Sequence, residues 1–444
     1  MTLTQTIAQA GIVGCGGAGF PTHVKVATAA DTLLVNAAEC EPLLGTDRFL
    51  LREHAAEICA AAEAVRAHLG ASAAVIVLKE SYRAEIAALD AVLPQYPQLR
   101  RHTLTSFYPA GDEQTLVYEV TGRSVPPGGL PGAVGCIVSN AATLYAVWQA
   151  LQGRAFTQKY VTINGAVRSP CILKVPIGTP LADCLEAAGG ASVRDYTVVS
   201  GGPMMGKVLS ADAAASACVT KTTSGFLLVP TQTRLVQNAV LSEPQTVRRA
   251  RAACIQCTFC TQLCPRNLIG HPLAPHAIMR KIGGGNWRAR LASDPTLQSA
   301  ALCCECGICE LYACPMQLQP RKVNALIKAE LRTQGIRPPA FALEEVRPMR
   351  EYRRVPTGRV AARAGVEIFS GYVPTRFVSL TPHRVCIALN SHIGVSAQPI
   401  VAVGERVALG QCIARPPADK LGAAYHASMD GTVTDVGEHI TIER

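Results

Sequence analysis

Two cysteine runs constrain this chain more than any other feature of its sequence. The first follows the pattern Cys-x2-Cys-x2-Cys-x3-Cys-Pro from Cys254 to Pro265, and the second repeats it, with a last gap of four residues, from Cys303 to Pro315. Thiolates spaced in this way surround one corner of an iron–sulfur cubane, while the fourth cysteine, before proline, ligates the other cluster. The two runs therefore predict two [4Fe–4S] clusters.

The crossover rule gives each cluster three ligands from one run and the fourth from the other. One predicted set is Cys254, Cys257, Cys260 and Cys314, and the other is Cys303, Cys306, Cys309 and Cys264. Cys304 is a ninth cysteine in this segment. It either replaces Cys303 as a ligand or is a buried thiol, and we favour the buried thiol.

Zinc is the alternative metal for such cysteines, because two Cys-x2-Cys pairs can form a tetrahedral site. Eight cysteines in two runs of three plus one, each closed by Cys-Pro, fit that geometry poorly. The chain has eighteen cysteines in all. We expect the nine outside this segment to be small buried hydrophobic residues.

Composition narrows the class of protein. A length of 444 residues suggests two to four domains, and a charged fraction of 17% excludes long-range disorder. No apolar run is long enough for a transmembrane helix, and the first ten residues lack the features of a secretory signal, so we expect a cytoplasmic protein without a membrane span. The formal charge is +10, with a basic patch at Arg347–Arg363. No nucleic-acid-binding motif accompanies that patch, and we interpret it as a solvated linker.

The sequence pattern divides the chain into four parts, which together predict an α/β and α+β multidomain protein. Residues 1–155 alternate buried-type strands with helices, including one long helix from Thr46 or Asp47 to about His68. Residues 156–235 indicate a small α+β domain, residues 240–340 a helical segment around the cysteines, and residues 355–444 a small β-barrel or sandwich.

A glycine-rich loop, Gly14-Cys15-Gly16-Gly17-Ala18-Gly19-Phe20-Pro21-Thr22, lies near the N-terminus and is followed by Lys25. Exposed backbone N–H groups in such a loop can bind phosphate, and Lys25 adds a positive charge. Glycine loops also serve as simple tight turns, and this one is not a dinucleotide fingerprint, because no clear strand precedes it.

The loop resembles the flavin loop of the FMN- and NADH-binding subunit of respiratory complex I and of the C subunit of Rnf-type complexes. Three further segments resemble the flavin segments of that superfamily, in the same order: Asn36–Pro42, Tyr108–Glu113 and Ser139–Leu144. The resemblance implies that Gly14, Gly16, Gly17 and Lys25 face the FMN, that Asn36, Glu39, Gly111 and Asn140 add polar contacts, and that Phe20, Glu41 and Glu113 lie near the nicotinamide nucleotide. Thr28 and Gly129 stand where the complex I protein uses aromatic residues to hold the dinucleotide.

Other segments extend the resemblance over the whole chain. Residues 160–230, with Ser200–Gly206, resemble the ligand-binding β-grasp module of this superfamily, and the cysteine segment resembles its two-cluster ferredoxin domain. The tail, with Gly404, Val407, Gly431 and Val433, resembles a barrel-sandwich hybrid module. This module comes last here and first in the Rnf C subunit, an order that resembles the cobalamin reductases of propanediol-utilisation microcompartments.

That resemblance implies an oxidoreductase that passes electrons from NADH or NADPH through FMN and two [4Fe–4S] clusters to cobalamin, reducing Co(III) to Co(II) and then to Co(I). A flavin suits this task because it accepts an electron pair and releases electrons singly. The implied partners are cobalamin, a cobalamin adenosyltransferase and microcompartment shell or lumen proteins, and the implied location is a bacterial microcompartment. Two alternatives remain open: an Rnf-like component of an electron-transfer complex, and a redox wire without nucleotide oxidation of its own.

Overall fold

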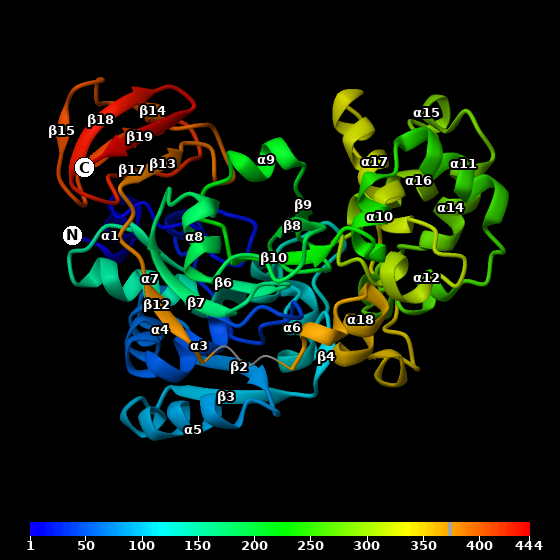
Figure 1. Ribbon diagram of the computed structural model, residues 1–444. Helices are drawn as coiled ribbons and strands as arrows, with labels where there is room; N and C mark the ends of the chain where they lie inside the picture. Colours follow the sequence, from blue (N-terminus) through cyan, green and yellow to red (C-terminus); the bar gives the residue numbers. More distant parts are fainter. Residues whose placement is uncertain (372–374) are drawn as a thin grey trace.

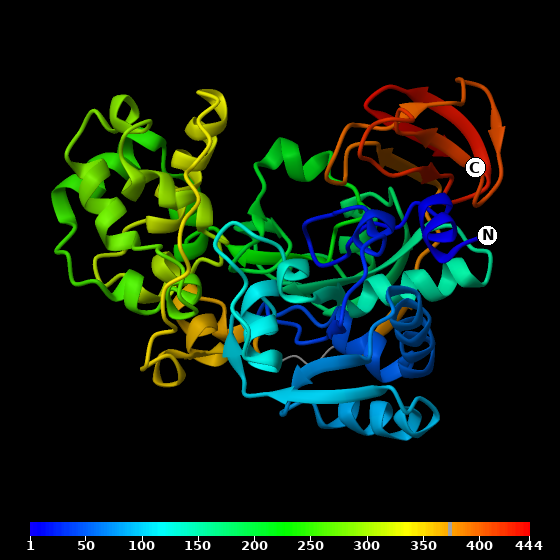
Figure 2. The same ribbon diagram turned by 180° about the vertical axis from the view of Figure 1, so that it is seen from behind.

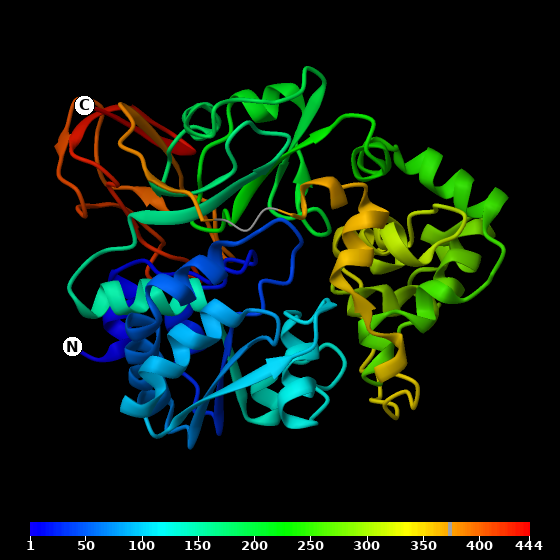
Figure 3. The ribbon, with the colours of Figure 1, turned by 60° about the horizontal axis from the view of Figure 1, so that its bottom comes forward.

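The computed structural model describes residues 1–371 and 375–444. Figure 1 shows an α/β domain below a central mixed sheet, with a helical module at one end and a β module at the other. The view from behind places the N-terminus beside the β module (Figure 2). With the bottom turned forward, the α/β domain and the helical module lie on opposite sides of the molecule (Figure 3). The multidomain α/β and α+β fold expected from the sequence is thus confirmed.

The N-terminal domain is built on a parallel four-stranded sheet in the order β3-β2-β1-β5. Its strands are β1 (Thr32–Asn36), β2 (Ala73–Lys79), β3 (Leu99–Leu104) and β5 (Cys136–Asn140). The chain builds outward from β1 to β3 and then returns to place β5 on the other side of β1. Such a switch point opens a crevice at the carboxyl ends of the strands, where ligands bind in open α/β sheets.

Strand side chains alternate between the two faces of this sheet and so form two cores. Leu33 and Val35 join the core under α4 and α7, whereas Leu34 joins the core under α6. The helices are α1 (Leu3–Gln9), α2 (Thr22–Lys25), α3 (Thr46–Glu53), α4 (Ala55–Leu69), α5 (Arg83–Val92), α6 (Glu113–Thr121) and α7 (Ala141–Leu151). The result is a three-layer domain.

The long helix predicted from Thr46 or Asp47 to His68 is wrong as a single element. It breaks at His54, whose φ of −135° and ψ of 33° separate α3 from α4. Gly45, not Thr46 or Asp47, is the residue before the first helical turn. The break lets α3 turn toward the carboxyl edge of the sheet, which leaves the Asp47 carboxylate free for other contacts.

The central sheet has six strands in the order β12-β7-β6-β10-β8-β9. They are β6 (Gln158–Gly165), β7 (Cys171–Pro176), β8 (Tyr196–Ser200), β9 (Lys207–Val208), β10 (Gly225–Pro230) and β12 (Phe377–Ser379). The sheet is mixed, because β6 pairs antiparallel with β7 and parallel with β10. Helices α8 (Leu181–Ala187) and α9 (Ala211–Ala215) accompany it. Strand β12 comes from far along the chain and ties the segment after the helical module to this domain.

The helical module carries the two cysteine runs on short helices. These are α10 (Arg234–Val240), α11 (Glu243–Ala253), α12 (Phe259–Gln262), α13 (Pro265–Leu268), α14 (Pro275–Gly283), α15 (Trp287–Arg290), α16 (Pro295–Gln298), a π-helical turn η4 (Ile308–Ala313) and α17 (Pro320–Thr333). Cys264 and Cys314 belong to its apolar core, alongside Leu297 and Val323.

The chain then returns to the N-terminal domain before it forms the β module. Strand β11 (Val355–Pro356) pairs with β4 (Phe107–Tyr108), and α18 (Thr357–Ala364) follows. The β module consists of two small sheets, β13-β19-β18-β15 and β14-β16-β17. Its strands are β13 (Arg384–Ala388), β14 (Gln398–Pro399), β15 (Arg406–Val407), β16 (Cys412–Arg415), β17 (Tyr425–His426), β18 (Gly431–Val436) and β19 (His439–Glu443).

Candidate functional site

A cavity of about 320 Å³ lies at the carboxyl ends of β1 and β5, where the strand order reverses. Ten of the eleven residues predicted to contact FMN or the nucleotide line it: Gly14, Gly16, Phe20, Lys25, Asn36, Glu39, Glu41, Gly111, Glu113 and Asn140. Gly17 belongs to the same loop, but it is exposed and does not line the cavity. Four segments far apart in the sequence therefore meet at one edge of the sheet.

The glycine loop is closed by backbone contacts and held against α7. The amide of Gly14 donates to the carbonyl oxygen of Phe20 at 2.9 Å, and the amide of Cys15 donates to Oγ1 of Thr143 at 2.9 Å. Gly19 adopts a φ of +70°, and a Cβ there would lie 2.7 Å from the Thr222 side chain. A glycine is required at this position by both conformation and space.

Asn36 and Asn140 are the last residues of β1 and β5 and pair in register. Nδ2 of Asn36 donates to the carbonyl oxygen of Gly111 at 2.9 Å, and Nδ2 of Asn140 donates to Oδ2 of Asp47 at 2.6 Å. Oδ1 of Asn140 accepts from the amide of Ala142 and so caps α7. The two amides thus fix the floor of the cavity and the start of a helix that points into it.

Lys25 extends from α2 to the far wall. Its Nζ donates to Oε1 of Glu113 at 3.0 Å and to the carbonyl oxygen of Val138 at 2.9 Å. Both charged side chains are about one-third exposed, at 31% and 38%. A phosphate at the glycine loop would compete with Glu113 for this ammonium group.

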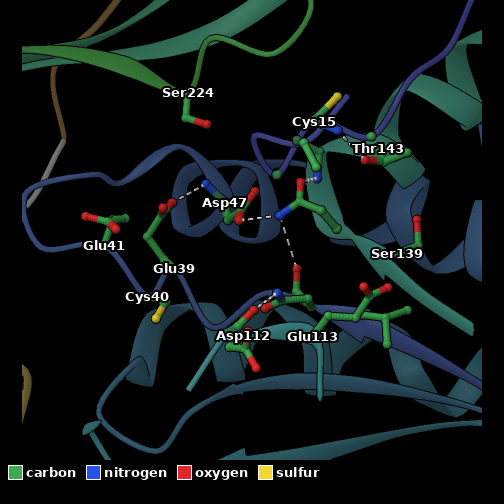
Figure 4. A pocket seen from close by; sticks show the side chains of 18 of the residues that line it. Cys15, Glu39, Cys40, Glu41, Asp47, Asp112, Glu113, Ser139, Thr143 and Ser224 are labelled. Carbon is green, nitrogen blue, oxygen red and sulfur yellow. Dashed lines mark hydrogen bonds between the residues drawn. The ribbon is translucent and has the colours of Figure 1, made fainter. Parts of the chain in front are cut away.

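Acidic side chains crowd the opposite wall (Figure 4). The amide of Asp47 donates to Oε2 of Glu39 at 2.6 Å, so the Glu39 carboxyl group lies against the first turn of α3. Burial raises the pKa of Glu39, and the neighbouring Asp47 charge raises it further. Burial likewise raises the pKa of Asp47, against the opposing effects of the Asn140 hydrogen bond and the Lys159 charge.

Glu41 joins this wall to the central sheet. Its carboxylate accepts hydrogen bonds from the amides of Met204 and Met205, at 2.9 and 3.0 Å, and from the hydroxyl of Tyr108 at 3.2 Å. Burial raises its pKa to about 7 although these bonds lower it. A Cβ on Gly202 would lie within 2.5 Å of this side chain, so the loop of the central sheet can approach Glu41 only with glycine there.

The cysteines form two groups in the helical module. Cys254, Cys257, Cys260 and Cys314 line one small cavity, although the last comes from the second run. In the other group, burial raises the pKa of Cys309, and the nearby Cys303 and Cys264 raise it further. The pKa of Cys306 is raised by its hydrogen bond with Cys304 and by burial. The nearby Cys309 and Cys264 raise it further. The first group thus combines three thiols of one run with one of the other, and in the second group Cys264 of the first run lies near Cys306 and Cys309.

Both loops follow the same backbone path. Gln256 and Thr258 have positive φ values of 54° and 67°, and Glu305 and Gly307 have φ values of 59° and 81° at the corresponding places. In this register Cys303 corresponds to Cys254, and Cys304 corresponds to Ile255. A hydrogen-bond donor from the residue two places on reaches each first thiol: Nε2 of Gln256 lies 3.1 Å from Sγ of Cys254, and the amide of Glu305 lies 3.3 Å from Sγ of Cys303.

The longer gap in the second run is absorbed by η4, the π-helical turn between Cys309 and Cys314. A π turn accommodates one additional residue within a helix. Glu310 anchors this turn, because its buried carboxylate pairs with Arg321 at 3.2 Å. Cys314 therefore reaches the first cysteine group despite the insertion.

The cysteine module meets the first cavity directly. Cys306 is one of the residues that line that cavity, and its carbonyl oxygen accepts a hydrogen bond from the Tyr108 hydroxyl at 2.7 Å. Arg266 reaches across to Asp112, with Nη2 2.8 Å from Oδ2 and both side chains about one-tenth exposed. A predicted cluster ligand and the glycine-loop residues thus share one cavity.

Four protein families match consecutive parts of the chain. They are the Nuo51 FMN-binding domain over residues 7–149, the SLBB domain over 160–208, the 4Fe-4S dicluster domain over 253–319 and the RnfC barrel sandwich hybrid domain over 377–444. Cobalamin reductase PduS of Salmonella typhimurium is 41% identical over 444 residues, which cover 100% of this chain and 96% of that protein. The chain belongs to the PduS cobalamin reductase family. PduS of Citrobacter freundii is 39% identical, with the same coverage of both chains.

This PduS family member is also similar to two more distant proteins. The C subunit of the ion-translocating oxidoreductase complex of Erwinia tasmaniensis is 33% identical over 276 residues, which cover 61% of this chain but 33% of that protein. An NAD⁺-reducing [NiFe]-hydrogenase in its H₂-reduced state gives a TM-score of 0.49 at 22% identity, covering 76% of this chain and 63% of that one. In the ranges 1–371 and 375–444, no helix has both the length and the apolar character needed to cross a bilayer.

The first cavity fits the flavin that the FMN-binding domain implies. The glycine-loop amides, Lys25 and the start of α7 are groups that can bind a phosphate there. Oγ1 of Thr22, another lining residue, is buried without a hydrogen-bond partner and can contact a ligand there. Thr28 and Gly129 do not line the cavity; Thr28 is exposed, and the carbonyl oxygen of Gly129 accepts from Gln114.

The cysteine groups fit the clusters that the dicluster domain implies. Arg266 lies beside Cys304 and Cys264, and its buried guanidinium group suits a neighbour of an anionic group. As the side chains stand, the described part of the chain contains no set of three His, Cys, Asp or Glu residues that could hold a single metal ion.

Several cavity residues were not predicted as ligand contacts, among them Tyr108, Asp47, Lys159, Met205 and Cys306. Tyr108 belongs to the flavin-like segment Tyr108–Glu113, and that resemblance is the sequence signal that could have identified it. Cys306 was assigned to a cluster, and nothing in its spacing indicates that it also reaches the cavity. No sequence signal marks Lys159, which comes from the edge of another domain.

Proposed function

We propose that this chain oxidises NADH or NADPH and passes the electrons through FMN and two [4Fe–4S] clusters to cobalamin. The observation that carries the proposal is the shared cavity, which Cys306 lines together with the glycine-loop residues. Full-length similarity to two cobalamin reductases supports the choice of acceptor. For the first reduction step, one NADH and two cob(III)alamin give NAD⁺, H⁺ and two cob(II)alamin.

The proposed FMN contacts are the residues that the superfamily motifs identify. Gly14, Gly16, Gly17 and Lys25 bind the phosphate end, and Asn36, Glu39, Gly111 and Asn140 bind the polar edge of the ring. Phe20, Glu41 and Glu113 contact the nicotinamide nucleotide. When bound, a flavin takes up two electrons as hydride and releases them one at a time, which matches clusters that each carry one electron.

The chain's own residues position and isolate this chemistry. Glu41, with its pKa near 7, is suited to hold a proton next to the cavity at neutral pH. Tyr108 holds the Cys306 backbone against the same wall. The paired Arg266 and Asp112 keep the cysteine module docked on the flavin domain.

The proposed cluster ligands are the two groups of four described above, with Cys303 rather than Cys304 in the second. The register of the two loops supports this choice. We further propose four domains at residues 1–155, 156–235, 240–340 and 355–444, and a bacterial microcompartment as the location. There the chain would supply reduced cobalamin to an adenosyltransferase and contact shell or lumen proteins.

An anaerobic reconstitution tests this function. The protein is purified without oxygen, its flavin and iron are measured, and NADH is added with and without cob(III)alamin. We expect one FMN and about eight iron atoms per chain, as two cubane clusters require, then bleaching by NADH and formation of cob(II)alamin. Clusters that dithionite reduces and NADH or NADPH does not would overturn the nucleotide-oxidising role and favour a redox wire.

A further inference from the structure

A second cavity, of about 550 Å³, adjoins the first and has a different chemical character. It lies where α7, β6, β7 and the β module meet, with Leu409 and Gly410 contributed by the β module. Cys15, Ala142 and Lys159 line both cavities. A molecule in the second cavity would therefore be separated from the first by a wall of only a few side chains.

The charge of this cavity is entirely positive. Arg154, Lys159 and Lys174 line it, and none of the described residues in its wall is Asp or Glu. The first cavity contrasts with it, because five carboxylic acids line that site. Arginine and lysine without competing carboxylates select an anion, and phosphate is the anion to which their hydrogen-bonding geometry is best suited.

Lys159 is the decisive member of this set. Only 4% of its surface is exposed, and among the described residues its ammonium group has no hydrogen bond or close ion pair, although its charge acts on the Asp47 carboxyl group. A buried charge that lacks a direct hydrogen-bonding partner is costly unless a ligand completes it. Because its side chain lines both cavities, Lys159 is available to an anionic group at their common wall.

Aromatic side chains form the other part of the wall. Tyr145 on α7 and Tyr160 on β6 lie with ring centroids 5.7 Å apart, edge to face, and Tyr145 is partly accessible. Lys174 lies opposite Tyr160 on the neighbouring strand, with its Nζ 5.9 Å from the ring centroid. Aromatic rings beside cations are the arrangement that binds a stacked base and its phosphate.

We propose that the second cavity binds a base–ribose–phosphate group, held by Arg154, Lys159 and Lys174 with its base in contact with the accessible part of Tyr145. Its volume suits one such group, since ligand pockets commonly enclose about 300–1,000 Å³. Two reactants of the proposed function, on which this inference rests, contain the group. One is the nucleotide half of the pyridine dinucleotide that faces away from the nicotinamide, and the other is the nucleotide loop of cobalamin.

The test measures equilibrium binding to the anaerobic, FMN- and cluster-loaded chain. The variant combines Arg154→Glu and Lys174→Glu, which belong to the second cavity alone. The matched control combines Lys207→Glu and Arg406→Glu, two exposed residues outside both cavities that give the same change in charge. The probes are NAD⁺, cyanocobalamin and dicyanocobinamide, the last of which lacks the nucleotide loop. Flavin and iron contents verify folding, and the milder Lys174→Gln replaces the double variant if either is lost.

We expect the double variant to weaken binding of NAD⁺ or of cyanocobalamin at least tenfold, with less than a twofold effect in the control. Weaker cyanocobalamin binding with unchanged cobinamide binding assigns the cavity to the corrinoid's nucleotide loop, and weaker NAD⁺ binding assigns it to the donor. Equal losses in variant and control, equal losses for cyanocobalamin and cobinamide, or no loss for either reactant would overturn the proposal. Wild-type reduction by NADH is measured in parallel, so that failure of the proposed function is seen separately from failure of this site.

Discussion

The hydroxyl of Tyr108 donates a hydrogen bond to the carbonyl oxygen of Cys306 at 2.7 Å and lies 3.2 Å from the Glu41 carboxylate. Tyr108 belongs to the flavin domain, Cys306 to the cysteine module and Glu41 to the loop that contacts the central sheet. One buried phenol therefore connects three parts of the chain at the wall of the first cavity.

Tyr108→Phe should lower the free energy of unfolding by about 1–3 kcal/mol, because a buried carbonyl and a buried carboxylate both lose a donor. It should also raise the pKa of Glu41, since the Tyr108 hydrogen bond is one of the interactions that lower it. Anaerobic denaturant unfolding measures the first effect. Tyr352→Phe is the control, because Tyr352 is 84% exposed; equal stability of the two variants would contradict the prediction.

Cys303→Ser and Cys304→Ser form a matched pair, since the two residues are adjacent and both partly buried. We expect the Cys303 variant to lose up to about four iron atoms per chain, as the loss of one cubane would give. The Cys304 variant should retain all iron and an unchanged EPR spectrum. Iron analysis and EPR of the dithionite-reduced proteins check this, and the reverse result would make Cys304 the ligand.

Local sequence patterns were sufficient where the structure depends on local chemistry. The apolar runs at Leu33–Val35 and Ala74–Leu78 are central strands, and Cys314 of the second cysteine run lines the same small cavity as the first three cysteines of the first run. In each case the interaction is between neighbours in the chain or follows from a fixed period.

Contacts made by docking of one domain on another could not be predicted in this way. Lys159 reaches the first cavity because β6 lies against the flavin domain, and nothing in the local sequence of this strand indicates that contact. The break at His54 is a tertiary effect too, since the stretch around it has strong helix propensity. Strand β12 pairs with β7 across some 200 residues, and no local pattern specifies that pairing.

Lys25→Ala should weaken FMN binding to the flavin-free protein by roughly 10- to 100-fold, because a charged hydrogen bond contributes about 1.5–3 kcal/mol. Glu113→Gln should leave FMN binding unchanged or tighter, because it removes the carboxylate that pairs with Lys25 at 3.0 Å. Quenching of flavin fluorescence measures both. Equal weakening by the two substitutions would indicate that the ion pair itself, and not the free ammonium group, supports the site.

Titration of Lys221 should make the stability of the protein depend on pH. Burial lowers its pKa to about 7, and its Nζ donates to the carbonyl oxygens of Gly11 and Ala424, which joins the N-terminal domain to the β module. Between about pH 7 and its unfolded pKa, the folded state binds fewer protons than the unfolded state. The contribution of Lys221 to the free energy of unfolding is therefore largest above the unfolded pKa. It decreases progressively as the pH falls from there to about 7.

Lys221→Met should therefore flatten the rise in stability between pH 7 and pH 9, where the wild-type slope from this group approaches about 1.4 kcal/mol per pH unit. The nearby titratable groups Cys15, Cys412, His392 and His426 remain in the variant. The Lys221 charge lowers the pKa of the two histidines, but burial already lowers both pKa values below the usual 6.5, outside this pH window. Denaturant unfolding at several pH values measures it. Lys207→Met, at an exposed position, should keep the wild-type slope.

Asp112→Asn tests how the cysteine module is held on the flavin domain. The substitution preserves the cap of α6, which accepts from the Thr115 amide, but it removes the charge that pairs with Arg266 in a site about nine-tenths buried. A buried cation left without its partner costs about 3–5 kcal/mol. Asp90→Asn removes the same charge from an ion pair with Arg101 whose side chains are 44% and 37% exposed, and should cost less than about 1 kcal/mol. Unfolding measurements on the two variants compare these costs directly. Adding Arg266→Gln to Asp112→Asn should recover part of the loss, because the orphaned charge is then gone; if the double variant is less stable by the sum of the two single effects, the pair does not couple the two domains.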